Sequence, residues 1–332
     1  MHILALQFFP RVGLLDFPER YGHDRARLPY PTGVLIIAAF LLLFLVTHEQ
    51  TMQSLGMISG VIILGVYSFF DDRTPLPSWM RLVIQVLIAF LIFATGSRIY
   101  TITNPLEGLA GIGGLIKLDT FDILTVGFGP LPFWSGVFTI FWLLLTINAL
   151  NWFDGIPGQV SMLSTIGFLT IGLLSLSARV NQPELAMIAF ILTGVCLAAL
   201  LFDFPPPKVI MGDTGAMFLG LMLGVLTIYA GGKVATAFLV LGVPLIDSGL
   251  VILGRMTKGR SIFRGSQSGE HLHHRLLAKG WSPRQVILLT AALGTLFGIT
   301  ALFLSTREKF FAAIILLCIM VGLRWYSRES GQ

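Results

Sequence analysis

The chain has 332 residues, of which 55% are hydrophobic and 12% are charged, and its formal net charge at pH 7 is +5. Soluble domains carry about 25% charged residues, so this composition, with a mean hydropathy of +0.84, excludes a soluble globular protein. The basic residues stand in short loops beside apolar runs, so the positive charge reflects membrane topology and does not indicate binding of nucleic acid.

The first segment, residues 1–15, is apolar but too short to cross a bilayer, and Pro10 interrupts it. It also lacks the layout of a signal peptide. Two interpretations stay open for this segment: a truncated first span, or a short helix that lies in the membrane interface.

The rest of the chain predicts an all-α polytopic membrane protein, folded as a single domain over residues 1–332, with about ten transmembrane helices. The expected spans are 33–47, 52–70, 79–96, 131–150, 160–178, 184–202, 213–230, 233–256, 285–305 and 309–324. The long connection at 97–130, in which glycines accompany alternating apolar residues, predicts a small extracytoplasmic hairpin or irregular cap.

The distribution of basic residues orients these spans. Of the 22 Lys and Arg residues, 16 fall on one side and six on the other. Because cytoplasmic loops are enriched in Lys and Arg, we expect the richer side to face the cytoplasm. That side receives the polar segments of the chain, so we expect a cleft there. These segments are Asp71–Asp72, the loops at 151–159 and 203–214, and the His/Arg loop at 257–284.

Asp71 and Asp72 end an apolar run in the stretch SFFDDRTPLP. Acids beside Arg73 at the end of a span could simply mark the membrane interface. The polar segments on the same side favour a functional role for the pair.

The stretch NALNWFDGIPG places Asn148 and Asn151 three residues apart at the end of a span, hence on one helix face. Asp154 follows where Gly155 and Pro157 break the helix. A polar helix end with a glycine turn explains this pattern without a function. Polar side chains at membrane depth, however, are costly and usually face a cavity or a partner, which favours a binding site.

In PPPKVIMGDTG, Lys208 precedes a Gly-Asp-Thr-Gly turn that opens the next helix. Backbone N–H groups at a helix start favour anions, and Asp213 beside Thr214 could hold Mg²⁺ against a phosphate. As a helix cap alone, Asp213 would be unremarkable. Because Lys208 and the Asn/Asp cluster are predicted on the same side of the membrane, a site for metal and phosphate is favoured.

The stretch SGEHLHHRLLAKG holds three of the six histidines, and His271, His274 and Arg275 share one face of a helix. Zinc is disfavoured because no third ligand is near, whereas the positive charge suits an anion clamp. Acids for a cation, amides to complete its shell and a basic cluster for anions together indicate phosphoryl transfer. At the membrane edge, one substrate would be a soluble nucleotide and the other a lipid.

Over about residues 14–284 the chain resembles the polyprenyl-phosphate N-acetylhexosamine-1-phosphate transferases. The motifs that carry the resemblance occur in family order at Leu15–Gly33, Asp71–Asp72, Asn148–Gly155, Met211–Gly215, Pro244–Asp247 and His271–Arg275. The ending H-L-H-H-R-L-L looks like the branch that starts O-antigen, enterobacterial common antigen or teichoic acid. The phospho-MurNAc-pentapeptide transferase of peptidoglycan synthesis is the alternative branch.

The resemblance implies transfer of a sugar 1-phosphate, such as GlcNAc 1-phosphate, from a UDP-sugar to polyprenyl (undecaprenyl) phosphate, with release of UMP. It implies Mg²⁺ or Mn²⁺ as cofactor, an active site facing the cytoplasm at the inner membrane, and a homodimer. Its implied metal ligands are Asp213 and Asn151. Its implied catalytic residues are Asp71, Asp72, Asp154, His271, His273, His274 and Arg275. Its implied substrate-binding residues are Arg20, His23, Asn148, Asn151, Lys208 and Thr214.

The lipid phosphate, whose second pKa is about 6, is mostly a dianion at neutral pH and needs no strong base. We therefore expect direct in-line attack, with Asp72 as an orienting group or weak base.

The chain departs from the family pattern at two positions. The family's R-K-x-H is here Arg20-Tyr21-Gly22-His23, which lacks the lysine, and Pro157 replaces the second acid of D-G-x-D-G. Relatives also show eleven spans rather than ten. These departures keep open a catalytically silent relative. An ion-coupled transporter is a further alternative, although its acids would be expected near the membrane midplane rather than at one edge.

Overall fold

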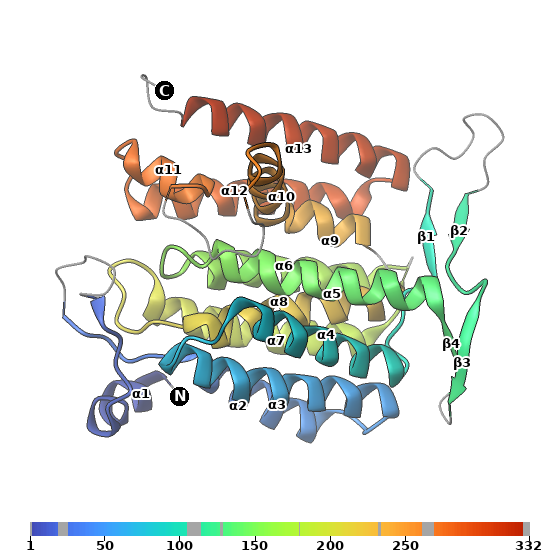
Figure 1. Cartoon of the computed structure of the whole chain (residues 1–332), viewed down its shortest axis with the longest axis horizontal. Coiled ribbons are helices and arrows are strands. Elements are labelled where there is room, and N and C mark those ends of the chain that lie inside the picture. The colour runs from blue at the N-terminus through green and yellow to red at the C-terminus, as the bar shows by residue number, and fades with distance from the viewer. Residues whose placement is uncertain are drawn as a thin grey trace.

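The computed structural model describes residues 2–18, 26–104, 114–126, 129–178, 180–231, 234–260 and 269–327. The molecule is mainly α-helical, and its long helices run side by side in one bundle (Figure 1). Short strands lie at one end of the bundle. The short helices α1 (His2–Phe8) and α11 (Leu272–Ala278) lie at the other end.

The predicted spans form helices close to their expected bounds. These helices are α2 (Gly33–Thr47), α3 (Met52–Arg73), α4 (Ser78–Ala94), α5 (Phe133–Phe153), α6 (Gln159–Leu176), α7 (Pro183–Asp203), α8 (Gly212–Tyr229), α12 (Pro283–Phe303) and α13 (Thr306–Tyr326). Within the described ranges, seven helices are long and apolar enough to cross a membrane, while α2 and α4 are shorter. Length and composition thus support seven or eight spans, where the sequence predicts about ten.

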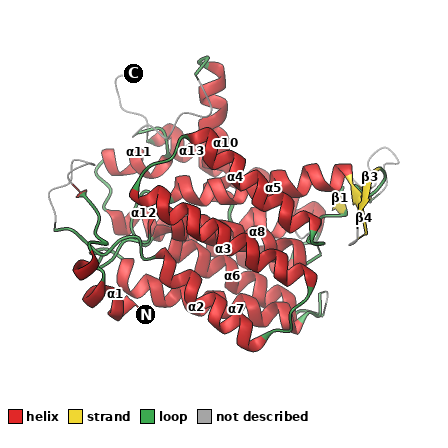
Figure 2. Ribbon diagram, turned by 60° about the horizontal axis from the view of Figure 1, so that its bottom comes forward, coloured by secondary structure: helices red, strands yellow, loops and turns green. Residues whose placement is uncertain are grey.

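The segment predicted as a span at 233–256 is sharply bent. This segment forms two helices, α9 (Val234–Val240) and α10 (Gly242–Thr257), which meet at an angle of 86°. Pro244 explains the break, because its ring would clash with the carbonyl of residue 240 in a continuous helix. In Figure 1, α10 is accordingly seen nearly end-on, and Figure 2 shows it projecting from the bundle.

The described part of 97–130 holds two antiparallel strand pairs, where the sequence predicts one hairpin or an irregular cap. β1 (Thr101–Thr103) pairs with β2 (Leu115–Lys117), and β3 (Asp122–Val126) pairs with β4 (Gly129–Pro132). The buried Arg98 joins the β3–β4 pair to α4, since its guanidinium donates to the carbonyl oxygens of Phe93 and Pro130. These strands lie at the opposite end of the bundle from α11.

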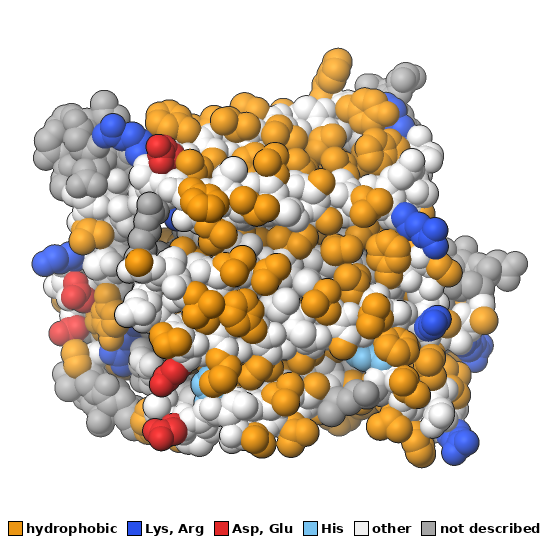
Figure 3. Space-filling view, turned by 180° about the vertical axis from the view of Figure 1, so that it is seen from behind, with side chains coloured by type: hydrophobic (Ala, Val, Ile, Leu, Met, Phe, Trp, Pro, Cys, Tyr) orange, Lys and Arg blue, Asp and Glu red, His pale blue; other side chains and the backbone are white. Residues whose placement is uncertain are grey.

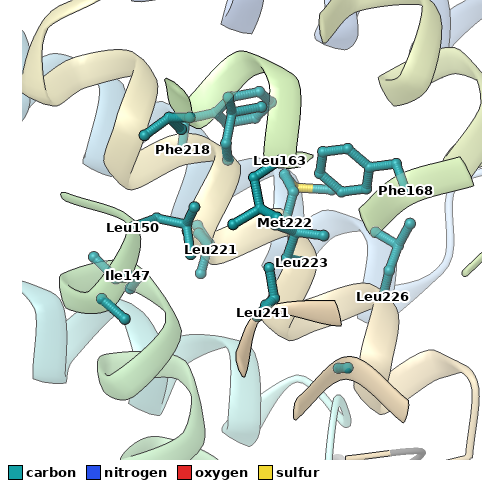
Figure 4. Packing of buried hydrophobic residues seen from close by; sticks show 14 of the residues in the cluster. Ile147, Leu150, Leu163, Phe168, Phe218, Leu221, Met222, Leu223, Leu226 and Leu241 are labelled. Carbon is teal, nitrogen blue, oxygen red and sulfur yellow. The ribbon is translucent and has the colours of Figure 1, made fainter. Parts of the chain in front are cut away.

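The core of the bundle is built around α8, whose apolar side chains pack against α5 and α6 (Figure 4). Glycines allow α8 and α5 to approach closely: a Cβ at Gly220 would lie 2.5 Å from the carbonyl oxygen of Thr146. A Cβ at Gly33, the first residue of α2, would lie 2.2 Å from the nitrogen of Gly215. Small residues at helix contacts are typical of membrane bundles. Here they hold the start of α8 against α2 and its interior against α5.

The exterior of the bundle fits a membrane. Hydrophobic side chains cover the middle of the face drawn in Figure 3, and charged side chains lie toward its two ends. Exposed tryptophans stand near helix ends: Trp79 at the start of α4, Trp325 at the end of α13 and Trp134 at the start of α5. Tryptophan concentrates at membrane–water interfaces, so both ends of the bundle are marked as interfacial.

The amino-terminal segment forms α1, of seven residues, and a 3-10 turn at Pro10–Val12. A helix of this length measures about 10 Å, which is too short to cross a bilayer. His2 stacks on Phe202 near the end of α7, with the ring centroids 5.4 Å apart. The segment thus packs at the end of the bundle that also holds α11.

Candidate functional site

Asp72, on the last turn of α3, caps the first turn of α8. One carboxylate oxygen accepts the backbone N–H of Asp213 at 3.0 Å and the Tyr30 hydroxyl at 2.7 Å. The other accepts the N–H and the hydroxyl of Thr214, at 3.0 Å and 2.6 Å. The carboxylate thereby satisfies N–H groups that have no partner within the helix, and it lies at the positive end of the α8 dipole.

The turn before this cap requires a glycine. Gly212 has a φ of +78°, and a Cβ there would lie 2.7 Å from a carboxylate oxygen of Asp72. Only glycine adopts this conformation without strain and leaves room for the acid. The Gly-Asp-Thr-Gly motif therefore has a structural reason as well as a chemical one.

Asp71 is buried and has partners other than those of Asp72. It accepts the backbone N–H of Leu76 at 2.6 Å and pairs with Arg81 at 3.2 Å. The same guanidinium nitrogen of Arg81 lies 3.6 Å from the carboxylate of Asp213. Arg81 thus bridges two acids from separate parts of the chain. The sequence analysis missed Arg81, although a cation among the apolar residues that begin a span is a recognisable signal.

Asn151 and Asn148 have different neighbours, although the sequence places them on one face of α5. The Asn151 side chain lies near the carboxylate of Asp213, although its buried amide nitrogen makes no hydrogen bond of good geometry among the described residues. Asn148 lies about 4.5 Å further along the helix axis and donates to Gln85 at 2.8 Å. Gln85 in turn donates to the hydroxyl of Tyr67 at 3.2 Å. Asn148 therefore belongs to a polar network between α3, α4 and α5.

Asp154, which follows α5, lies near three other carboxylates. Burial, followed by the negative charges of Asp213, Asp203 and Asp72, raises the pKa of Asp154 well above its ordinary value. Asp203 ends α7, is 2% exposed and accepts the hydroxyl of Ser161. The sequence analysis missed Asp203, although it ends an apolar run as Asp71 does. Three acids from α3, α7 and α8 and one from the loop after α5 therefore share one electrostatic environment.

His271 is oriented by Asp247 on α10. The Nδ1 of His271 donates to one carboxylate oxygen at 2.7 Å, and the N–H of Leu272 donates to the other at 3.0 Å. Arg324, from the last helix, lies 3.6 Å from the same carboxylate. An acid bound to one ring nitrogen sets which tautomer the imidazole adopts. The motif Pro244–Asp247 thus supplies the orienting acid for His271.

His273 lies between the rings of His271 and His274, at centroid distances of 5.8 Å and 4.2 Å. It is 2% exposed, and burial, followed by the charges of His274 and His271, lowers its pKa well below the ordinary value. Burial also lowers the pKa of His274. At neutral pH the rings of His273 and His274 therefore act as polar neutral groups. Arg275 adds positive charge to the cluster, and its Nε donates to the carbonyl of Gly269.

The histidine cluster packs on the loop that carries Asp154. The ring of Phe153 meets His273 edge-on at 6.3 Å, and Trp152 lies 6.2 Å from His271. A Cβ at Gly155 would lie 1.9 Å from the Nε2 of His273, so only glycine fits there. The structure therefore brings the acids and the histidines together through residues 152–155, although more than a hundred residues separate them in sequence.

The donor set at Asp213 fits a hard cation that is completed by substrate. Within the described ranges, no group of three or more His, Cys, Asp or Glu side chains could hold a metal alone. Mg²⁺, however, is usually bound through one or two carboxylates together with substrate phosphates and water. The Asp213 carboxylate and the Asn151 side chain offer oxygen ligands of that kind.

The remaining predicted substrate-binding residues are placed differently. Arg20 and His23 lie outside the described residues. Lys208 is exposed on the loop before α8, and its backbone N–H donates to the carbonyl of Phe202. Thr214 is buried and its hydroxyl is bound to Asp72, so it supports the turn of Asp213. The cleft expected at this end of the bundle stays a prediction.

Comparison with known proteins places the chain among membrane transferases. The family model of glycosyl transferase family 4 matches residues 54–231. A probable undecaprenyl-phosphate N-acetylglucosaminyl 1-phosphate transferase of Bacillus subtilis is 27% identical, over 97% of this chain and 86% of its own length. A decaprenyl-phosphate N-acetylglucosaminephosphotransferase of Mycobacterium tuberculosis is 29% identical, over 80% and 67%. A phospho-N-acetylmuramoyl-pentapeptide-transferase of Rickettsia canadensis is 27% identical, over 87% and 82%.

Proposed function

The chain belongs to glycosyl transferase family 4, and from that premise we propose that it transfers N-acetylhexosamine 1-phosphate from a UDP-sugar to a polyprenyl phosphate. The sugar is GlcNAc, the lipid is undecaprenyl phosphate or a similar polyprenyl phosphate, and UMP is released. This is the first membrane step of a cell-envelope glycan. The names of the relatives from Bacillus and Mycobacterium support this assignment. The observation that carries it is the meeting of Asp213, Arg81 and the histidine cluster at one end of the bundle.

Asp213 and Asn151 would hold Mg²⁺ or Mn²⁺, because their oxygens are the hard ligands that these ions prefer. When bound, the ion would neutralise negative charge on the diphosphate of the donor. The neighbouring side chains of the protein bind and orient the two substrates.

Arg81 and Arg275 supply positive charge for phosphate oxygens. Arg81 already lies between Asp71 and Asp213, so a modest shift of its side chain would let it meet a phosphate beside them. Because the Nδ1 of His271 donates to Asp247, the Nε2 of an uncharged ring can only accept a hydrogen bond, for example from a hydroxyl of the donor sugar. The oriented donors that stabilise charge during phosphoryl transfer are the two guanidinium groups.

The lipid phosphate attacks directly, and Asp72 acts as a positioning residue. Both oxygens of Asp72 already accept hydrogen bonds, so its lone pairs are engaged in holding the first turn of α8. A phosphate monoester with a second pKa of about 6 needs little help from a base at neutral pH. These two observations support single displacement in line with the leaving UMP.

The active site faces the cytoplasm at the inner membrane. The excess of Lys and Arg on this side supports that orientation, because cytoplasmic loops carry such an excess. The donor, a soluble nucleotide sugar, then reaches the site from the compartment in which nucleotide sugars are made. Membership of the family favours this transferase over an ion-coupled transporter.

A phospho-MurNAc-pentapeptide transferase activity is the second candidate, because relatives with that name also match most of the chain. Both activities use the same lipid and release UMP, so the donor separates them. The His271–Arg275 motif, in the form H-L-H-H-R, favours the GlcNAc branch.

The test is to incubate the purified protein with undecaprenyl phosphate, Mg²⁺ and, in turn, UDP-GlcNAc, UDP-GalNAc and UDP-MurNAc-pentapeptide. We expect UMP release with UDP-GlcNAc, dependent on both lipid and Mg²⁺, and its loss in Asp213→Ala. Asp122→Ala, an exposed acid on β3 at the opposite end of the bundle, is the matched control and should keep full activity. UMP release from none of the three donors would overturn the proposal.

A further inference from the structure

Gln159, the first residue of α6, is a buried amide without a hydrogen-bond partner in the described part of the chain. It is 0% exposed, and neither its side-chain oxygen nor its nitrogen has a hydrogen-bond partner among the residues that the structure describes. Gly158 before it has a φ of +89°, which turns the chain into the helix. A glutamine buried in this way needs a partner, because unpaired buried amides are costly and rare.

His273 shares this property. Both ring nitrogens of His273 are buried and lack a hydrogen-bond partner among the described residues. Burial lowers the pKa of His273. The ring is therefore neutral at pH 7, with one nitrogen as donor and the other as acceptor. Which nitrogen carries the proton depends on what each nitrogen can bond to.

Gln159 and His273 line the same small cavity. It has a volume of about 10 Å³, and its wall also contains Thr290 and Asp247 among apolar side chains. The hydroxyl of Thr290 donates to the carbonyl of Ile287, which leaves its oxygen able to accept. A volume of this size corresponds to about one water, and a buried water needs two to four polar partners. Gln159, His273 and Thr290 supply three.

We propose that Gln159 is a positioning residue for His273, and that one buried water in this cavity links the amide to the imidazole. The link holds the ring in one tautomer and in one orientation against Gly155, beside the loop that carries Asp154. Its role in turnover rests on the proposed transferase function. The water site itself does not.

The kinetic test compares Gln159→Leu with the wild-type enzyme. Leucine has a similar size and removes both polar atoms. We expect kcat to fall about tenfold, as is typical when a group that orients a functional histidine is removed. The KM for the UDP-sugar should change by less than about twofold, because the amide does not contact substrate. The melting temperature should fall, because the change removes one partner of the proposed water and leaves the buried His273 ring with a weaker hydrogen-bond network.

A double-mutant cycle and a matched control make the result specific. In a His273→Asn background, Gln159→Leu should have no further effect on kcat, because the two changes break the same link. Ser164→Ala removes a buried hydroxyl on α6 that has no hydrogen-bond partner within the described ranges and does not line the cavity, so it should leave kcat unchanged. An equal loss of kcat in both backgrounds, or wild-type kcat in Gln159→Leu, would overturn the proposal.

The water is tested directly by an experimental density map of the wild-type protein that resolves other buried waters. We expect density within about 2.7–3.2 Å of both the Gln159 amide and the His273 ring. A direct bond between the two side chains, or a dry cavity, would contradict the inference. The water between Gln159 and His273 is observed or not whether or not any donor sugar yields UMP. Failure of the proposed function and failure of the water site are therefore distinguishable.

Discussion

The carboxylate of Asp72, at the end of α3, accepts both the backbone N–H and the hydroxyl of Thr214 in the first turn of α8, at 3.0 Å and 2.6 Å. This contact joins two segments that lie 142 residues apart. Asp213, a proposed metal ligand, precedes Thr214 in this turn, and its backbone N–H also donates to Asp72. The position of Asp213 therefore depends on an acid from another helix. The second acid of the DD pair therefore acts on the site through the backbone of α8.

Asp72→Asn should therefore destabilise the protein and lower its activity together. The amide nitrogen would face N–H donors, and the unfolding free energy should fall by about 1–3 kcal/mol. Thr214→Val should cost less, because it removes only the hydroxyl. Unfolding in mixed micelles of both single variants and the double variant would give a coupling energy of about 0.5–3 kcal/mol. If the losses of unfolding free energy in the two single variants simply add in the double variant, the contact between Asp72 and Thr214 does not contribute to stability.

Arg81→Ala should change the metal dependence of the reaction. The guanidinium lies 3.6 Å from the Asp213 carboxylate, so it competes with a bound cation for that charge. We expect the Mg²⁺ concentration for half-maximal UMP release to fall a few-fold, while kcat drops about tenfold or more through loss of charge stabilisation. Arg73→Ala is the matched control, because Arg73 donates to the carbonyl of Gly13 instead. A higher Mg²⁺ requirement in Arg81→Ala would contradict this view.

Gly155→Ala should impair the site through a steric clash. The new Cβ would lie 1.9 Å from the Nε2 of His273, so the ring or the loop must move. Overpacking of this kind typically costs about 1–3 kcal/mol. Gly194→Ala on α7 is the control: a Cβ there meets nothing within 4 Å, and alanine should stabilise the helix by about 0.5–1 kcal/mol. Melting temperatures and UMP release would be measured for both variants, and equal behaviour would refute the proposed close contact.

Stability should fall as the pH drops below about 6.5, in part through His273. Its folded pKa lies well below the ordinary value of 6.5, so in this window the unfolded chain binds a proton that the native ring does not. The contribution is complete above pH 6.5 and is lost at lower pH, by at most about 1.4 kcal/mol per pH unit. His273→Asn should show a shallower loss of melting temperature between pH 7.5 and pH 5.5. A slope equal to that of the wild type would show that His273 is not desolvated.

Several features of the site were predictable because they depend on local chemistry. The acids at span ends, the Gly-Asp-Thr-Gly turn and the histidine motif are visible as polar residues where an apolar chain meets water. The capping of α12 was also predictable: Ser282 accepts the N–H of Gln285, as the Ser-Pro-x-Gln pattern indicates. Pro244 could have located the break between α9 and α10, since a proline three residues into a helix marks a start.

The sequence by itself determined that the protein is a helical membrane protein with its polar motifs gathered on one side, because hydropathy and charge depend on composition along the chain. It did not determine the pairings. Only the tertiary structure decided that Asp72 holds α8, that Arg81 joins Asp71 to Asp213, and that Asn148 bonds to Gln85 rather than to the site. These contacts depend on how helices rotate and approach, which is set by small residues and packing across the whole bundle.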